Sequence, residues 1–190
     1  MKIFTFKGFA IVFLFFIILL IIYSKLPKDQ IIEKNLEITE KDFVNSNIIK
    51  DIKYSSKDLK GNEYFINADE GEIDINNSDI IFLKNVTAYI DLVKKNEIIT
   101  ISSDFGKYNT VTYDTIFSKN VKVDYIDSNL TGNYLDFSMK NNLLIMSKNV
   151  VYTNPNNILK ADVIKLDTIT KDTKIFMHNS DEKVEVRSKN

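Results

Sequence analysis

Few side chains in this sequence could carry acid–base or nucleophilic chemistry. There is no cysteine and only one histidine, His178, so neither a thiol nucleophile nor a histidine relay can be assembled. The carboxylates from Asp69 to Asp74 alternate with apolar residues, as on the outward face of a strand, whereas a two-carboxylate hydrolase needs them to meet in a cleft. We therefore expect no enzyme, no catalytic residue, no metal site and no cofactor.

The composition is that of one folded domain of moderate size. The chain has 190 residues, of which 44% are hydrophobic and 27% charged, and its net charge is -1. Leaving out residues 1–30 leaves 21 basic and 25 acidic residues, a net charge of -4. This balance is unsuited to a generic nucleic-acid binder. Without cysteine, neither a disulfide framework nor lipid attachment of the lipoprotein type is available.

The most apolar part of the sequence lies near its start. No charged residue occurs from Gly8 to Ser24, and lysines precede this stretch. A membrane-spanning helix needs about 17–25 such residues, and the preceding positive charges favour an N-terminus on the inside of the membrane. Bulky residues follow where a signal peptidase requires small ones, so we expect a retained signal anchor over 1–24. Its membrane residues would include Phe9, Phe13, Phe16, Leu20 and Tyr23.

The remaining sequence divides into a tether and a β-rich domain. Residues 25–45 are charged and show no clear period, and we interpret them as a tether. Over residues 46–190 apolar and polar residues alternate, for example at Tyr64, Ile66 and Ala68, which predicts half-buried strands. Pairs of turn-forming residues separate the runs at 76–77, 109–110, 141–142 and 171–172.

An internal repeat organises this β region. Its first marker, a small residue followed by Asp or Asn, recurs at intervals of 35, 29 and 29 residues, and its second, Lys-Asn-Val, at intervals of 35 and 29. The first marker occurs at Ala68-Asp69, Ser103-Asp104, Gly132-Asn133 and Ala161-Asp162, and the second begins at Lys84, Lys119 and Lys148 and is reduced to His178-Asn179 in the last unit. We expect the six additional residues of the longer interval in the loop around Lys94–Asn96.

Each unit therefore predicts one long hairpin that bends where the small residue stands, because a residue without bulk lets the backbone kink. Stacked bent hairpins would form two facing antiparallel sheets, an open-ended, repeat-built β-jelly roll. The expected fold class is all-β, with an N-terminal transmembrane helix before this jelly roll. Its terminal strands would carry unpaired backbone groups that another β-protein can extend.

The repeat also aligns apolar residues into ladders that we expect to face inward. A packed core and a groove open to acyl chains are both compatible with such ladders. Because burying one methylene contributes about 0.8 kcal/mol, an open groove could hold lipid without any charge contact. The candidate lipid-binding residues are Ile66, Phe82, Val86, Ala88, Ile101, Phe117, Val121, Val123, Leu130, Met146, Val150, Tyr152 and Leu159.

Three segments after the apolar start resemble a known family. Residues 58–69 (DLKGNEYFINAD), 99–108 (ITISSDFGKY) and 116–121 (IFSKNV) are similar, in this order, to motifs of the LptC family. That family is the membrane-anchored periplasmic component of the lipopolysaccharide export bridge. The resemblance extends over roughly the whole chain, although each motif is short and mostly structural, and the C-terminal unit matches least well.

The resemblance implies a bridge component rather than an enzyme. The anchor would join the subunits of an inner-membrane ABC transporter that extracts lipopolysaccharide. The domain, in the periplasm, would receive the acyl chains in its apolar interior and pass them to a soluble periplasmic partner of the same fold, joined edge to edge. The edge expected to meet that partner contains Ile175, Val184 and Val186.

Two alternatives remain open at the level of sequence. Cleavage near residue 24 would favour the soluble bridging relative of the same fold. A closed interior would favour an anchored β-repeat scaffold or assembly factor.

Overall fold

The computed structural model describes residues 38, 48–57, 61–93, 95–168, 170, 172–179 and 181–189. The expected anchor over 1–24 and, apart from Ile38, the expected tether over 25–45 lie outside these residues. Within the described part of the chain, all regular structure is β-strand, as the alternating pattern predicted. The strands are β1 (Ile48–Lys57), β2 (Glu63–Asp74), β3 (Asn77–Leu92), β4 (Glu97–Asn109), β5 (Thr115–Tyr125), β6 (Ser128–Ser138), β7 (Leu143–Thr153), β8 (Asn157–Asp167), β9 (Thr173–Phe176) and β10 (Glu185–Ser188).

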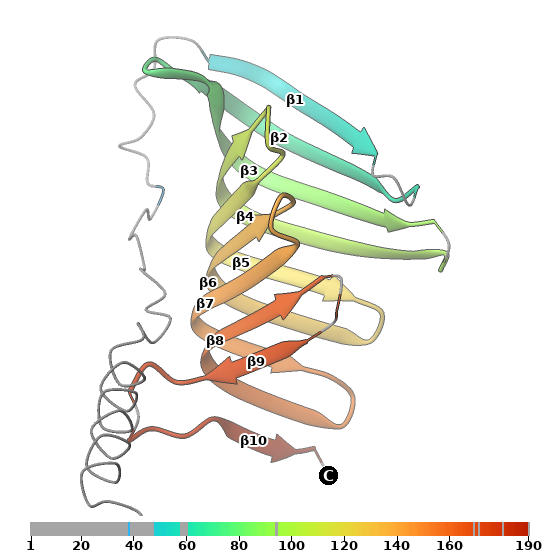
Figure 1. Cartoon of the computed structure of the whole chain (residues 1–190), viewed down its shortest axis with the longest axis vertical. Helices are drawn as coiled ribbons and strands as arrows, with labels where there is room; N and C mark the ends of the chain where they lie inside the picture. The colour runs from blue at the N-terminus through green and yellow to red at the C-terminus, as the bar shows by residue number, and fades with distance from the viewer. Residues whose placement is uncertain are drawn as a thin grey trace, which may run out of the picture. The chain divides into compact units, whose positions relative to one another are not determined.

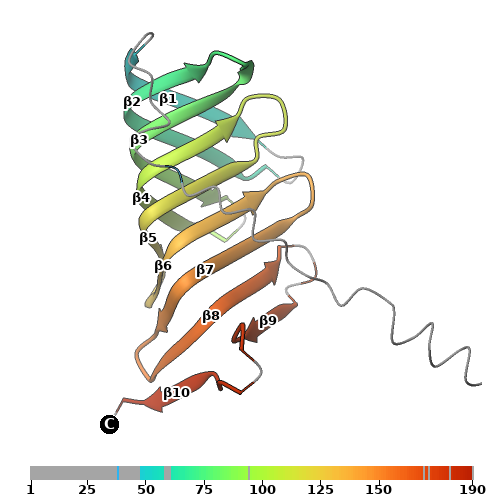
Figure 2. The ribbon, with the colours of Figure 1, turned by 90° about the vertical axis from the view of Figure 1, so that its left-hand side faces the viewer.

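The strands form one open antiparallel sheet in sequence order. Consecutive strands pair with each other from β1 to β8, and both β9 and β10 pair with β8. Figures 1 and 2 show this succession from β1 at one end to β10 at the other. The sequence had suggested two facing sheets. The structure has one hydrogen-bonded sheet because each long strand keeps its partners on both sides of its bend.

The bends divide the sheet into two arms, which we call arm I and arm II. Arm I holds the strand parts on the side of the turn at residues 93–96, and arm II holds those on the side of the turn at 75–76. The paired turn residues expected from the sequence lie at the end of arm II. Arm I comprises residues 52–57, 63–68, 86–92, 97–103, 121–125, 128–132, 150–153 and 157–161, and arm II comprises 48–50, 70–74, 77–84, 105–109, 115–118, 134–138, 143–147 and 163–167.

The two repeat markers meet at the bends. The Asn85 side-chain amide donates to the Asp69 carboxylate at 2.9 Å, and Asn120 donates to Asp104 at 2.8 Å, each pair 16 residues apart. At the fourth bend the backbone N–H of His178 donates to Asp162 at 2.9 Å, again across 16 residues. At the first two bends the Asp of one marker is therefore held by the Asn of the other marker on the next strand.

The asparagines also supply the backbone conformation of the bend. Asn85, Asn120 and Asn149 have φ values of 52°, 53° and 58°, in the left-handed region that asparagine tolerates better than most residues. In β5 and β7 the preceding lysine is left-handed as well, with φ 66° at Lys119 and 65° at Lys148. In β3 only Asn85 adopts this conformation, and the β2–β3 register runs through the bend without a shift.

The small residues of the first marker stand where the arms converge. A Cβ atom on Gly132 would lie 2.8 Å from Met146 Sδ on the neighbouring strand, closer than atoms pack without displacement. Ala68, Ser103 and Ala161 are all buried at the same place in their units. Side-chain bulk is therefore limited at each bend, as the repeat predicted.

The longer first interval is distributed differently from what we expected. The four-residue turn at 93–96 takes up part of the six residues, compared with the two-residue turn at 126–127. The other four lengthen the arm I parts of β3 and β4, 86–92 and 97–103, by two residues each relative to those of β5 and β6, 121–125 and 128–132. Arm I is thus broadest at β3 and β4.

The last bend differs from the others. β9 pairs with Val163–Leu166 on arm II, and β10 pairs with Asn157–Lys160 on arm I. Residues 177–184 between β9 and β10 take the place of a continuous bent strand. The C-terminal edge of the sheet therefore consists of two short strands, one on each arm, whereas the other edge is the continuous ten-residue β1.

Candidate functional site

The inner faces of the two arms enclose one continuous apolar cluster. It draws residues from every strand from β1 to β8, and its largest fully buried side chain is Phe117, with 1% of its surface exposed. The alternation along each strand produces this arrangement, because every second residue points to the same face. The buried members are Ile52, Ile66, Ala68, Ile81, Leu83, Val86, Ala88, Ile90, Ile101, Tyr108, Phe117, Val121, Val123, Leu135, Met146, Val150 and Ile164.

Two aromatic contacts show that the arms face each other. The ring centroids of Tyr54 (β1, arm I) and Tyr108 (β4, arm II) are 5.2 Å apart. Those of Tyr64 (β2, arm I) and Phe137 (β6, arm II) are 6.3 Å apart and stacked. Neither pair belongs to adjacent strands of the sheet, so these rings meet across the space between the arms rather than along the ladder.

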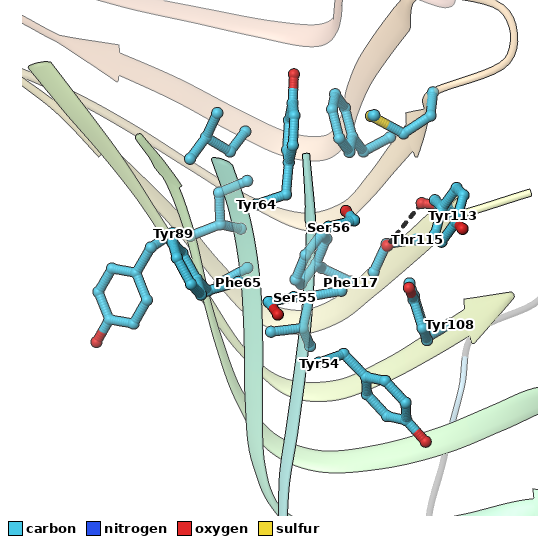
Figure 3. A pocket seen from close by; sticks show the side chains of 16 residues that line it. Tyr54, Ser55, Ser56, Tyr64, Phe65, Tyr89, Tyr108, Tyr113, Thr115 and Phe117 are labelled. Carbon is cyan, nitrogen blue, oxygen red and sulfur yellow. Dashed lines mark hydrogen bonds between the residues drawn. The ribbon is translucent and has the colours of Figure 1, made fainter. Parts of the chain in front are cut away.

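These aromatic residues surround a small cavity (Figure 3). Phe117 and Thr115 of β5 line it together with Tyr54, Tyr64 and Tyr108. Tyr89 also borders the cavity, but its ring is turned away from Phe117 in the figure. Its volume is about 30 Å³, enough for about two water molecules and too small for an acyl chain. In this conformation the interior is closed.

Burial decreases from the first units to the last. At equivalent positions of the repeat, Ile66 and Ile101 are 9% and 1% exposed, whereas Leu130 and Leu159 are only partly buried. Val123 is likewise buried, and its counterpart Tyr152 is only partly buried. On arm I the apolar interior is therefore more accessible over β6 to β8 than over β2 to β5, whereas on arm II Leu135 and Met146 are 0% exposed.

The structure brings most of the candidate lipid-binding residues together. Nine are buried in the inner cluster: Ile66, Val86, Ala88, Ile101, Phe117, Val121, Val123, Met146 and Val150. Leu130, Tyr152 and Leu159 pack against it while partly exposed. Phe82 is the exception, since it packs in a second cluster with Ile38, Phe105 and Ile116.

The different place of Phe82 follows from the bend of β3. In β5 two left-handed residues, Lys119 and Asn120, separate Ser118 from Val121, whereas in β3 only Asn85 separates Lys84 from Val86. One residue fewer in the bend reverses the face of the residues before it. Leu83, which is 0% exposed, therefore takes the inner position that Phe117 takes in β5.

The sequence reasoning missed several inner residues. Leu83 and Leu135 are 0% exposed, and the aromatic rim of Tyr54, Tyr64 and Phe137 packs against the cluster. A signal was present for Tyr64, because it alternates with Ile66 on the same face. A signal was also present for Leu83. The residue before Lys-Asn-Val is leucine in the first unit and serine in the next two, so an apolar side chain stands there only in the first unit.

Most carboxylates near the repeat markers serve the fold. Asp69 accepts the bond from Asn85, and Glu70 lies 3.4 Å from Lys84. No group of three or more metal-ligating side chains occurs among the residues that the structure describes.

A surface pocket on arm II contains two carboxylates. Asp114 and Asp136 line it, and the Ser138 hydroxyl donates to Asp114 at 3.1 Å. Burial, with a contribution from Asp114, raises the pKa of Asp136. Burial, together with Asp136, raises the pKa of the neighbouring Tyr134 to about 12. The pocket lies apart from the apolar interior and shares no lining residue with the cavity there.

The residues proposed for the partner edge lie at the C-terminal end of the sheet. Ile175 in β9 is 38% exposed and Val186 in β10 is 62% exposed. Val184 immediately precedes β10 and is partly buried. The two arms thus each present one exposed apolar residue at this edge.

The membrane-anchor residues Phe9, Phe13, Phe16, Leu20 and Tyr23 lie outside the described residues. Within the part of the chain that the structure describes, no helix is long and apolar enough to cross a membrane. Comparison with known proteins adds no identification, because no family model and no curated protein matches this sequence.

Proposed function

We propose that this chain is a membrane-anchored bridge component of lipopolysaccharide export. It receives lipopolysaccharide from an inner-membrane ABC transporter and passes the acyl chains between its arms to a soluble periplasmic partner of the same fold. The observation that supports this proposal most is the continuous apolar lining between the arms, which extends from β1 to β8. The resemblance of the sequence motifs to the LptC family supports it independently.

The charge of the domain favours recognition of the apolar part of the lipid. With a net charge of -4 beyond residue 30, long-range electrostatics would repel phosphorylated sugars rather than attract them. Burial of acyl chains contributes about 0.8 kcal/mol per methylene, so a few buried methylenes per chain offset this repulsion. The lipid would therefore bind through its tails, with the headgroup outside the arms.

The proposed jelly roll consists of two facing layers formed by the arms of the single sheet. To admit acyl chains the layers must move apart, because the cavity between them is about 30 Å³. The contacts to be broken are Tyr54–Tyr108 and Tyr64–Phe137, which are cross-arm contacts rather than ladder hydrogen bonds. Opening can therefore leave the strand pairing intact.

A photocrosslink tests whether lipid enters between the arms. Benzoylphenylalanine replaces Tyr64, on the inner face, in one variant and Tyr89, which is 37% exposed, in the other. The two positions are close in the sheet, because the register pair Phe65–Tyr89 follows the pair Tyr64–Ile90. Membranes contain the full chain, the transporter and ATP. We expect a lipopolysaccharide adduct at Tyr64 that increases with ATP, and none at Tyr89.

A third probe at Phe117 reports the deep interior. No adduct at Tyr64, Phe117 or Tyr152, in membranes where the transporter itself crosslinks to lipopolysaccharide, would contradict the bridge function.

The alternative is an anchored scaffold or assembly factor with a closed core. The small cavity and the exposures of 0–1% at Leu135, Met146 and Phe117 favour it. The same crosslinks distinguish the two, because a scaffold yields no lipid adduct on the inner face. N-terminal sequencing of the mature protein distinguishes the third candidate, the soluble relative, which would begin near residue 25.

A further inference from the structure

A second apolar cluster lies on the outer face of the sheet. It consists of Phe82, Phe105 and Ile116 together with Ile38. Phe82, Phe105 and Ile116 are each followed in the chain by a residue on the inner side of the sheet. These following residues are Leu83 and Phe117, which belong to the inner cluster, and Gly106, which packs against that cluster. Because successive residues of a strand point to opposite faces, Phe82, Phe105 and Ile116 point away from the inner cluster. We call these three residues, with Ser118, the outer-face site.

Ile38 occupies this site as a residue from a distant part of the sequence. Its side chain is 3% exposed, and that of Phe105 is 6% exposed. The Ser118 hydroxyl, 0% exposed, donates to the backbone carbonyl oxygen of Ile38 at 3.2 Å, across 80 residues of chain. A buried hydroxyl needs such a partner. The site therefore holds both the side chain and the backbone of Ile38.

Two lysines border the outer-face site. The Lys107 ammonium lies 5.8 Å from the centroid of the Phe82 ring, and the Lys119 ammonium lies 5.4 Å from that of Phe105. The residues around Ile38 have a net negative charge, because Glu37, Glu40 and Asp42 outnumber Lys41. The two lysines complement the charge of the segment that carries Ile38, whereas Asp136 is the register partner of Ile116 on the β6 side of the site.

We propose that the outer face of β3 to β5 is a docking site for the chain's own segment before β1, with Ile38 as its anchoring residue. The tether would then end at Ile38 instead of at Ile48. If the proposed membrane anchor ends near residue 24, docking shortens the maximum reach of the tether from about 85 Å to about 50 Å. This consequence rests on the proposed anchor, whereas the docking itself does not.

The absence of tryptophan from the sequence allows a clean test. Phe105→Trp or Phe82→Trp places a single tryptophan in the outer-face site of the full chain, held in phosphatidylcholine nanodiscs. We expect Ile38→Asp to shift its emission to longer wavelength and to raise acrylamide quenching severalfold. Ile38→Val keeps the apolar contact and should leave both unchanged. Ile48→Asp, at a residue that is 42% exposed, is the matched control.

A separate reporter, Phe117→Trp, monitors the inner cluster. Docking requires that Ile38→Asp leaves this reporter unchanged while it exposes the outer one. Unchanged emission at both outer reporters would overturn the proposal. A change at Phe117→Trp would overturn it too, since Ile38 would then be part of the domain core. Shielding that survives Ile38→Asp and increases with protein concentration would assign the site to a second copy of the chain instead.

Discussion

At the scale of single residues, the bends depend on asparagines that combine two properties. Asn120 adopts φ 53° and its amide donates to Asp104 at 2.8 Å. An alanine can supply neither, because its Cβ disfavours the left-handed region and it has no donor. A glycine supplies the conformation only.

Substitutions at Asn120 should therefore separate the two contributions. We expect Asn120→Gly to lower the free energy of unfolding by about 1 kcal/mol, the net value of one hydrogen bond, and Asn120→Ala to lower it by about 1 kcal/mol more. Urea unfolding followed by circular dichroism measures both. Equal losses for Gly and Ala would show that the backbone conformation contributes nothing.

The carboxyl group of Asp136 gives a pH dependence of definite sign. Burial, with Asp114, raises its pKa in the folded state above the ordinary 3.8, so the folded state binds the proton more tightly than the unfolded state. Its ionisation should therefore reduce stability as the pH rises from 3.8 through the raised value. We expect Asp136→Asn to raise the urea midpoint at pH 7 and to lose that advantage below 3.8.

Asp124 provides the opposite comparison for this experiment. The hydrogen bond from Lys122 lowers the pKa of Asp124 in the folded state. The ionised Asp124 therefore stabilises the folded state above pH 3.8, and this stabilisation is lost as the pH falls through the lowered pKa. Asp124→Asn should lower the urea midpoint at pH 7. The same sign for both variants would contradict this account of the two carboxyl groups.

At the scale of structural elements, the arms are joined by the bends and by the aromatic pairs that cross between them. Tyr64 and Phe137 stack at 6.3 Å although β2 and β6 are not neighbours in the sheet. Aromatic pairs of this kind contribute about 0.5–1.5 kcal/mol beyond their buried area. That energy is lost when the arms separate.

A double-mutant cycle on Tyr64→Leu and Phe137→Leu should therefore show coupling of about 0.5–1.5 kcal/mol in the free energy of unfolding. The control cycle pairs Phe137→Leu with Tyr89→Leu, on the outward side of the same arm, and should be additive. Additivity in both cycles would mean that the arms do not hold each other through these rings.

The split C-terminal edge offers a test of partner binding. Deleting residues 175–190 removes β10 and half of β9 and uncovers the edge of β8. If this edge meets the soluble partner, co-purification with that partner should be lost while co-purification with the transporter is kept. Retained partner binding by a deleted chain that still gives a β-rich circular dichroism spectrum would place the partner elsewhere.

Much of the sheet could be predicted because its markers are local. The small residue with Asp, the Lys-Asn-Val and the turn pairs each specify their own bend or turn, and the structure places them there. The face of Phe82 could not be predicted by alignment to Phe117, because it depends on whether one or two residues of the bend are left-handed. The number of sheets depends on continuity of pairing through the bend, which no single residue encodes.

At the scale of the whole molecule, the burial of the inner residues differs between the two ends of the sheet. On arm I, Ile66, Ile101 and Val123 are at most 9% exposed, while their counterparts Leu130, Tyr152 and Leu159 are partly exposed. β8 is also covered only by the short β9 and β10. Local opening should therefore require less free energy at the C-terminal end of the sheet.

Hydrogen exchange with mass spectrometry should show this difference. We expect peptides from β8 to exchange faster than peptides from β4, although both strands pair on two sides. Peptides from β9 and β10 should exchange fastest, since each has one neighbour in the sheet. Uniform exchange across β4 and β8 would indicate that the sheet opens only as a whole.

The sequential strand order has a further consequence for how the protein reaches this structure. Every strand from β2 onward pairs with the strand made just before it, apart from β10, which returns to β8. Closure of each new hairpin therefore involves only a short loop, and its entropic cost does not grow as the chain lengthens. A chain emerging from its N-terminal end can add hairpins one after another onto an edge that is already folded. Folding can thus keep pace with synthesis, with the two short terminal strands joining last.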